Sequence, residues 1–269
     1  MANLTSYKGN FNNFADQEFE FEAKGRQVFQ GIGAIALNVE CLVGVFPSSN
    51  EWVTIEVDTD NLDNFKASQD DNVLVVEQRQ PQEPQVVNNF SNNFSGAVFD
   101  NVSFNFDDDG VTIDGGSVTR GSEAEEYPSK IRIFAPSNLD VYACLRGRSV
   151  LASKVPFDHA IVEVNGVATV GLAAHTLEFA HAGIGDSFIV VQGGDVELTL
   201  SGSGSVRLKG EMSQIKALIT GAGNIWTKGY CRGDYVAIVR GHGAIAHSGT
   251  VGGSTYREIT GQGTISIPD

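Results

Sequence analysis

The sequence predicts an all-β protein, a right-handed parallel β-helix or β-solenoid with coils of about 20 residues and an elaborated N-terminal half. Three observations lead to this fold class. A glycine pair recurs at a nearly fixed interval, apolar residues keep the same interval, and apolar and polar residues alternate between the glycines. A sustained apolar period of about 3.6 residues, which would indicate amphipathic helices, is nearly absent.

The recurring glycine pair has the form Gly-x-Gly and occurs five times, with steps of 19, 19, 20 and 20 residues between the first glycines. Its ten glycines are Gly183, Gly185, Gly202, Gly204, Gly221, Gly223, Gly241, Gly243, Gly261 and Gly263. Three pairs are followed by a further glycine, which is Gly210, Gly229 or Gly249. We expect the pairs to form corners and the further glycine to form a turn, because glycine adopts positive φ without a steric penalty from Cβ.

Apolar residues keep the register of the glycines. The position two residues before a pair holds Leu200, Ile219, Val239 or Ile259, and the position four residues after its first glycine holds Val206, Ile225, Ile245 or Ile265. The alternation around these positions is typical of strands with one buried face. One coil cannot bury that face alone, so we expect the coils to stack with equivalent residues in ladders. The crossover rule predicts a right-handed path.

The chain divides into three regions. Residues 1–24 are predicted to form an N-terminal arm and first strand, residues 25–140 an N-terminal β region with loops inserted at about 81–128, and residues 141–269 the regular solenoid repeats.

Weaker signs of the repeat extend upstream of the regular coils. Gly147 and Gly166 continue the spacing before Gly183, and Gly31-Ile32-Gly33 is similar to the corner pairs. The N-terminal region is therefore expected to be the same solenoid with larger excursions.

The charge of the chain narrows the classes of partner. With 33 acidic and 18 basic residues, the formal net charge is −15. Such a surface repels nucleic acids and anionic lipids, so we expect neither nucleic-acid binding nor membrane insertion. The first residues show no signal peptide, so we expect synthesis in the cytoplasm and assembly into a virion or a surface structure.

Candidate metal ligands are few. Asp107, Asp109 and Asp114 are a candidate site for Ca²⁺, which prefers oxygen ligands, and a solvated turn is the alternative. No other cofactor is expected. The three cysteines, Cys41, Cys144 and Cys231, are too far apart in sequence for a metal knuckle and are expected to be free thiols.

No catalytic residues are predicted. The acidic residues of the regular repeats, Asp195, Glu197, Glu211 and Asp234, are interpreted as lying at different phases of the coil, without a facing pair. The chain is therefore expected not to be an enzyme.

Aromatic residues supply the candidate interaction surfaces. Two Asn/Phe tracts contain Phe11, Phe14, Phe90 and Phe94, which either tuck onto the solenoid flank or contact a neighbouring subunit. The rings of Trp52, Trp226 and Tyr230 either stack against a glycan or take buried or capping roles.

The repeated coils resemble a known family. Ser201-Gly202-Ser203-Gly204-Ser205-Val206 and Thr220-Gly221-Ala222-Gly223-Asn224-Ile225 are similar to the repeats of the head GIN domain family of putative auto-transporter adhesins. Upstream, Val57–Leu62 and Ile131–Leu139 are similar to further segments of that family. The resemblance covers most of residues 25–269. It implies a single-stranded right-handed β-helix and a cell-surface or adhesive setting, with no catalytic residues.

The expected function follows from these observations. We expect a non-enzymatic structural or adhesin-like β-solenoid that acts through surface interactions and assembles as a homo-oligomer or with partners, on a cell surface or in a phage virion. The alternative is a carbohydrate-binding or carbohydrate-active parallel β-helix protein.

Overall fold

The computed structural model describes residues 23–78, 103–107, 110–114 and 129–268. They belong to two compact units. The unit Ala23–Arg79 with Ser129–Asp269 is a β-solenoid. The other unit contributes an antiparallel hairpin of β7 (Ser103–Asp107) and β8 (Gly110–Asp114), which is described by itself.

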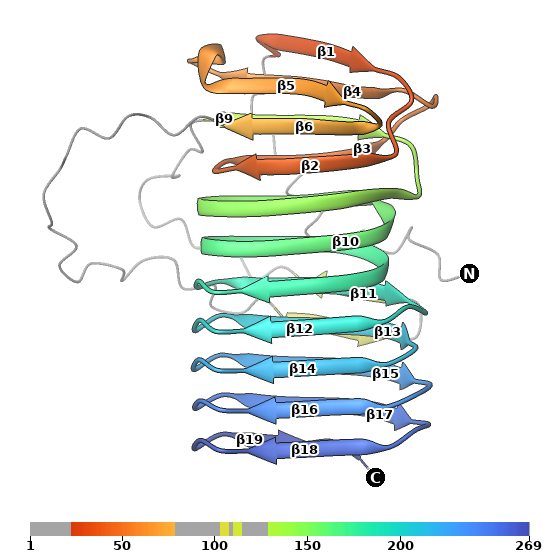
Figure 1. Ribbon diagram of the computed structural model, residues 1–269, viewed down its shortest axis with the longest axis vertical. Helices are drawn as coiled ribbons and strands as arrows, with labels where there is room; N and C mark the ends of the chain where they lie inside the picture. The colour runs from red at the N-terminus through yellow and green to blue at the C-terminus, as the bar shows by residue number, and fades with distance from the viewer. Residues whose placement is uncertain (1–22, 79–102, 108–109, 115–128, 269) are drawn as a thin grey trace, which may run out of the picture. The chain divides into compact units, whose positions relative to one another are not determined.

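Each regular coil consists of one strand in a front sheet and one in a rear sheet, as seen in Figure 1. The front strands are β12 (Val196–Leu200), β14 (Ile215–Ile219), β16 (Tyr235–Val239) and β18 (Thr255–Ile259). The rear strands are β11 (Asp186–Gln192), β13 (Ser205–Met212), β15 (Asn224–Cys231), β17 (Ala244–Val251) and β19 (Thr264–Ser266). Within each sheet the strands pair in parallel with the next coil. Front strands run leftwards and rear strands rightwards as the chain descends, so the solenoid is right-handed, as predicted (Figure 1).

The coils upstream of β11 form one continuous strand, β10 (Leu139–His181), which contributes in turn to the front and the rear sheet. It pairs in parallel with β11 and β12 on one side and with β2 (Ala34–Val39) and β3 (Leu42–Pro47) on the other. The chain segment before residue 79 therefore belongs to the same solenoid.

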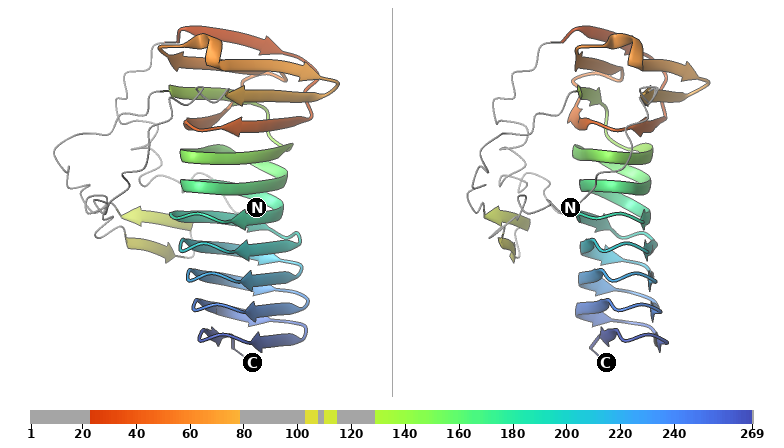
Figure 2. Two further views of the ribbon diagram at one scale, coloured as in Figure 1. Left: turned by 60° about the vertical axis from the view of Figure 1, so that its left-hand side comes forward. Right: turned by 90° about the vertical axis from the view of Figure 1, so that its left-hand side faces the viewer.

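Antiparallel strands close the N-terminal end of the solenoid. First β6 (Val73–Gln78) and β9 (Ser129–Ala135) extend the stack in parallel on β2 and β3. Beyond them, β4 (Val53–Thr59) pairs antiparallel with β9, β1 (Gly25–Phe29) with β4, and β5 (Phe65–Asp70) with β6. A 3-10 helix, Leu62–Asn64, precedes β5. Figure 2 shows this red and orange end opposite the blue coils of β18 and β19. The predicted elaboration of the N-terminal half is confirmed.

The core consists of apolar ladders between the two sheets, as predicted. Leu200, Ile219 and Val239 occupy one inward column and are fully buried. Ile259 continues this column in β18 but is 48% exposed. Among the described residues no strand follows β18 in the stack, so the last member of the ladder is covered on one side only.

The glycine pairs lie at the corners that the sequence predicts, but for a different reason. Of the ten corner glycines only Gly185 has positive φ, at 125°. The others are required by the close approach of successive coils. A Cβ on Gly221 would lie 2.2 Å from the Gly202 carbonyl oxygen, and a Cβ on Gly241 2.0 Å from that of Gly221. Only a residue without a side chain fits this backbone-to-backbone contact.

The third glycine of each repeat does not form a turn, which corrects the prediction. Gly210, Gly229 and Gly249 lie inside β13, β15 and β17, with φ values of 136°, 131° and 147°. They stack in register. A Cβ on Gly229 would also lie 1.9 Å from the Gly210 carbonyl oxygen. Positive φ and close stacking therefore both require glycine here.

The upstream glycines divide into two groups. A Cβ on Gly166 would lie 2.2 Å from the Gly147 carbonyl oxygen, so these two glycines extend the corner column as their spacing predicted. Gly31 and Gly33 instead lie between β1 and β2, ahead of a front strand (Figure 1). The regular pairs precede rear strands, so the similarity of this motif does not mark an equivalent corner.

Candidate binding surfaces

A column of outward side chains runs along the rear sheet. Phe188 in β11, Arg207 in β13 and Trp226 in β15 are register partners. The guanidinium carbon of Arg207 lies 5.5 Å from the centroid of the Phe188 ring and 5.1 Å from that of the Trp226 ring. Both distances are within the range of cation–π attraction. The register of three coils thus places one guanidinium group between two aromatic rings.

Lysines and a tyrosine extend this surface. Lys209 and Lys228 form the next outward column on β13 and β15, and Tyr230 follows Lys228 on the same face. Trp226 is 37% exposed and Tyr230 is 44% exposed. We call these six side chains the aromatic–basic face, and they are Phe188, Arg207, Lys209, Trp226, Lys228 and Tyr230. The six side chains include three cations on a chain whose net charge is −15. Glu211, the register partner of Tyr230, adjoins them, and its charge is paired with Arg232.

The front sheet carries a hollow of about 440 Å³ on its outer surface. We call it the polar hollow, and its polar lining residues are His159, Thr176, Glu178, Asp195, Glu197, Gln214, Lys216 and Asp234. Several of these side chains bond across coils. Gln214 donates to Asp195 over 2.8 Å, and Lys216 forms an ion pair with Glu197 at 2.5 Å.

The polar hollow corrects one reading of the sequence. Asp195, Gln214 and Asp234 precede the register partners Val196, Ile215 and Tyr235, so Asp195 and Asp234 share one phase, two coils apart. The unequal steps of 19 and 20 residues hide this alignment in the sequence. Glu211 lies apart from them in β13 of the rear sheet, where Arg232 pairs with it at 2.8 Å.

A polar cluster is buried inside the solenoid. Thr227 Oγ1 lies 2.8 Å from the Tyr235 hydroxyl and 2.9 Å from Nδ1 of His247. Burial raises the pKa of Tyr235 and lowers the pKa of His247. His242 on the same coil is exposed, so the two histidines point different ways, as their phases indicated. The enclosed position of the cluster suits a structural role.

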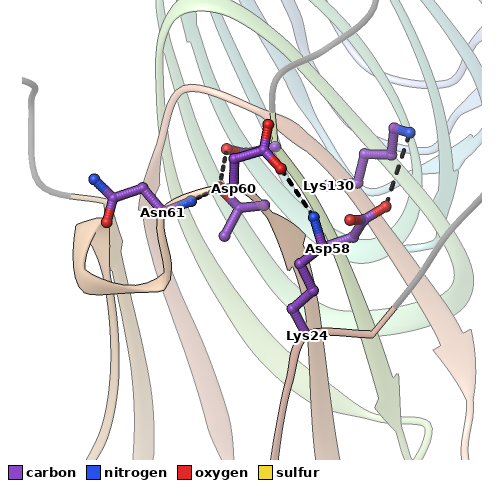
Figure 3. Close-up of polar contacts among 7 residues, drawn as sticks. Lys24, Asp58, Asp60, Asn61 and Lys130 are labelled. Carbon is purple, nitrogen blue, oxygen red and sulfur yellow. Dashed lines mark hydrogen bonds and ion pairs between the residues drawn. The ribbon is translucent and has the colours of Figure 1, made fainter.

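Another polar group surrounds the points where the chain enters the solenoid, before β1 and at β9 (Figure 3). Lys24 pairs with Asp60 at 2.9 Å, and Lys130 lies 3.9 Å from Asp58. Lys24 lowers the pKa of Asp60 through this hydrogen bond. The Thr59 and Ser129 hydroxyls lie 3.0 Å apart and are both buried. These contacts fix the ends of β4 and β9.

Several predicted site residues lie outside the described part of the chain. These are Phe11, Phe14, Phe90, Phe94 and Asp109. Asp107 and Asp114 belong to the hairpin, where Asp107 pairs with Gly110 beside the turn and Asp114 pairs with Ser103 at the open end. The backbone thus separates these two residues by the length of the hairpin. The Ca²⁺ site stays a prediction.

Other candidates are placed clearly. Cys41, Cys144 and Cys231 are free thiols, as expected, and Cys41 and Cys231 are buried. Trp52 is 47% exposed before β4 and is separate from the aromatic–basic face. Among the described residues no three His, Cys, Asp or Glu side chains gather as a metal site. Within the same residues, no helix is long and apolar enough to cross a membrane.

The described coils define a right-handed β-solenoid with chemically distinct outer faces. Solved structures that are similar to it include three proteins described as putative adhesins. The one from Bacteroides fragilis has a TM-score of 0.57 at 14% identity, over 91% of this chain and 98% of that protein.

The other two proteins come from Parabacteroides species. For Parabacteroides distasonis the TM-score is 0.53 at 12% identity, over 93% of this chain and 98% of that protein. For Parabacteroides merdae it is 0.51 at 12% identity, over 91% and 95%. At sequence identities this low, the structural similarity shows that the fold is shared and nothing more. No family model and no curated protein matches the sequence, so membership of the head GIN domain family stays a prediction.

Proposed function

We propose that this chain is a non-enzymatic, adhesin-like binding module that acts through the outer faces of its solenoid and assembles with copies of itself or with partner proteins. The observation that carries the proposal is the aromatic–basic face, where an arginine is held between two aromatic rings on three successive coils. Aromatic and arginine side chains are enriched in protein binding sites.

The solenoid supports such a role because it holds the side chains in fixed positions. Each of β11, β13 and β15 pairs with strands of neighbouring coils. Side chains that are ordered before binding lose less conformational entropy when a ligand arrives. The adhesin descriptions of the Bacteroides and Parabacteroides proteins favour the same setting. We place the chain on a cell surface or in a virion, and in the head GIN domain family.

A solid-phase binding assay tests this function. Purified protein is passed over immobilised mucin, fibronectin and fixed bacterial cells, and retention is compared with that of Trp226→Ala and Tyr256→Ala. Tyr256 is a matched control, because it is 53% exposed but lies on the front strand β18. We expect retention on at least one surface, reduced about tenfold by Trp226→Ala and unchanged by Tyr256→Ala.

Two results would count against the proposed function. Failure of the unaltered protein to be retained on any of the three surfaces would remove the adhesive role. If Trp226→Ala is retained as strongly as the unaltered protein, the aromatic–basic face is not the surface that adheres.

The polar hollow favours a second candidate, a carbohydrate-active protein. Glu178, Asp195, Glu197 and Asp234 bring carboxylates from neighbouring coils into one hollow, and paired carboxylates are the usual groups of glycoside hydrolysis. Incubation with a panel of polysaccharides, followed by measurement of reducing ends, tests this function. Cleavage that disappears in Asp195→Asn would establish it, and absence of cleavage would leave the hollow without a catalytic role.

A further inference from the structure

Resting on the function proposed above, we propose that the aromatic–basic face binds an acidic oligosaccharide, a short glycan that carries carboxylate or sulfate groups. The face combines the two kinds of group that such a ligand requires. Planar aromatic rings offer apolar faces to the C–H groups of a sugar ring. Lysine and arginine offer charged donors to its anionic groups.

The arrangement of the rings fits a ligand that lies along one strand of the rear sheet. Trp226 and Tyr230 are outward residues of the same strand, β15, with Lys228 between them. All three are exposed. Outward residues of one strand are about 7 Å apart, so a sugar stacked on either ring places its substituents beside the lysine.

The cations also lie close enough together to act on one ligand. Lys209 and Lys228 are register partners on neighbouring strands, about 5 Å apart at the backbone. Arg207 lies on the adjacent column. Arg207, Lys209 and Lys228 each take part in further interactions within the chain, so the proposal depends on their positions and not on free charges.

The charge of the whole chain selects against long polyanions. The net charge is −15, but salt screens such charges beyond about 8 Å, so a short ligand senses mainly the local cations. Three cations on two strands match a few anionic groups. They do not match a long nucleic acid, whose phosphates would continue beyond these cations.

The test uses fluorescence and matched ligands. The chain has two tryptophans, so Trp52→Phe leaves Trp226 as the only indole reporter. Tetragalacturonate supplies carboxylates, its methyl ester supplies the same sugars without charge, and a heparin tetrasaccharide supplies sulfates. A single-stranded oligonucleotide is included as a different class of anion. We expect Trp226 emission to change with one or both acidic sugars, and the affinity to fall as NaCl rises.

Variants locate the site. In calorimetric titrations Trp226→Ala should weaken binding about tenfold and Lys228→Gln about threefold, from loss of a stacking contact and of a charged donor. The controls are Tyr256→Ala on the front strand β18 and Lys66→Gln on β5, both exposed and outside the aromatic–basic face and the polar hollow, and they should leave the affinity unchanged. Circular dichroism establishes that each variant is folded. At the register of Trp226 the next strand carries Ala246, so alanine is compatible with this position.

Each other outcome overturns the inference in a recognisable way. Equal affinity for tetragalacturonate and its methyl ester would show that the carboxylates do not contribute to binding. Unchanged affinity of Trp226→Ala and Lys228→Gln for the acidic sugars would place the binding site elsewhere. Tighter binding of the oligonucleotide would replace the glycan by a nucleic acid. Adhesion to fibronectin or fixed cells without binding to either sugar would refute the glycan and retain the adhesive function. Absence of all retention would refute both.

Discussion

At the scale of single residues, the most unusual side chain of the solenoid is His181. It is 1% exposed, and among the described residues neither ring nitrogen makes a hydrogen bond of ordinary geometry, although the Ile184 backbone acts on the ring. It occupies the inward column that continues with Leu200 and Ile219, and its ring lies edge-on to Phe179 at 6.0 Å. A buried polar ring without a well-formed hydrogen bond in an apolar column reduces stability.

This histidine also makes stability depend on pH. Burial lowers the pKa of His181, and the Ile184 backbone and Asp186 oppose this shift. The unfolded chain, with a pKa near 6.5, therefore takes up a proton before the folded chain does. The stability that depends on a neutral His181 is fully present above about pH 6.5, and it is lost as the pH falls through the lower pKa of the folded state. His247, whose pKa burial also lowers, acts in the same direction.

We therefore expect His181→Leu to stabilise the protein. Leucine fills the same column in the next coil, at Leu200, and the substitution removes two buried nitrogens that lack well-formed hydrogen bonds. The free energy of unfolding at pH 7 should rise by about 1 kcal/mol, and the loss of stability between about pH 7 and pH 5 should become smaller. Urea unfolding at both pH values measures this. The exposed His242→Leu is the control, and an unchanged pH dependence in His181→Leu would contradict the account.

At the scale of the repeating element, the corner glycines set the distance between coils. The second glycine of each pair lies against its counterpart in the preceding coil. A Cβ on Gly223 would lie 2.0 Å from the Gly204 carbonyl oxygen and 2.7 Å from a methyl carbon of Leu200. The middle residue of the pair varies among Ile184, Ser203, Ala222, His242 and Gln262, which are all exposed. The glycine positions of a corner thus exclude any side chain, whereas the middle position accepts side chains of different sizes.

A pair of substitutions tests this difference. Gly223→Ala should lower the free energy of unfolding by about 3 kcal/mol or more, because the methyl group forces two coils apart. Ser203→Ala should change it by less than about 0.5 kcal/mol, because this side chain faces solvent. Thermal and chemical unfolding of both variants gives the comparison. Similar stability of the two variants would mean that the coils separate easily at the corner.

The sequence predicts these elements well where one pattern repeats. Corners and ladders follow from spacing alone, because each coil repeats the contacts of the one before. The same spacing of 19 residues links Phe188, Arg207 and Trp226, so it could have identified the aromatic column before the structure. The antiparallel closure by β1, β4 and β5 depends on pairings between distant segments, which no local pattern encodes. The shared phase of Asp195 and Asp234 was hidden by a change of step length.

At the scale of the whole solenoid, the two ends are built differently. Among the described residues β1 and β5 are the last strands at one end, and β18 and β19 at the other. Unpaired strand edges invite association, and charged side chains oppose it. Near the C-terminal edge one inward column ends in Arg257, which donates to the Ile267 carbonyl oxygen over 2.8 Å. The preceding members of this column are Phe179, Leu198, Ala217 and Ala237. The last coil thus carries a polar residue where the others are apolar.

The proposed self-assembly is tested by the mass of the protein in solution. We expect light scattering of the full chain to show an oligomer that dissociates when residues 1–15, with Phe11 and Phe14, are deleted. A monomer at micromolar concentration in both cases would refute assembly through the N-terminal arm, and it would leave the proposal for the aromatic–basic face intact.

The polar residue of the last coil gives a separate prediction about association. Arg257→Leu would extend an apolar ladder to the exposed edge, beside Ile259, which is already 48% exposed. We expect this variant to form larger, concentration-dependent species by end-to-end contact, because an apolar patch and an open strand edge then coincide. Arg232→Leu is the control, since it removes the same charge from an exposed position one coil earlier, where Arg232 pairs with Glu211. If both variants keep the mass of the unaltered protein, Arg257 does not prevent end-to-end association at this edge.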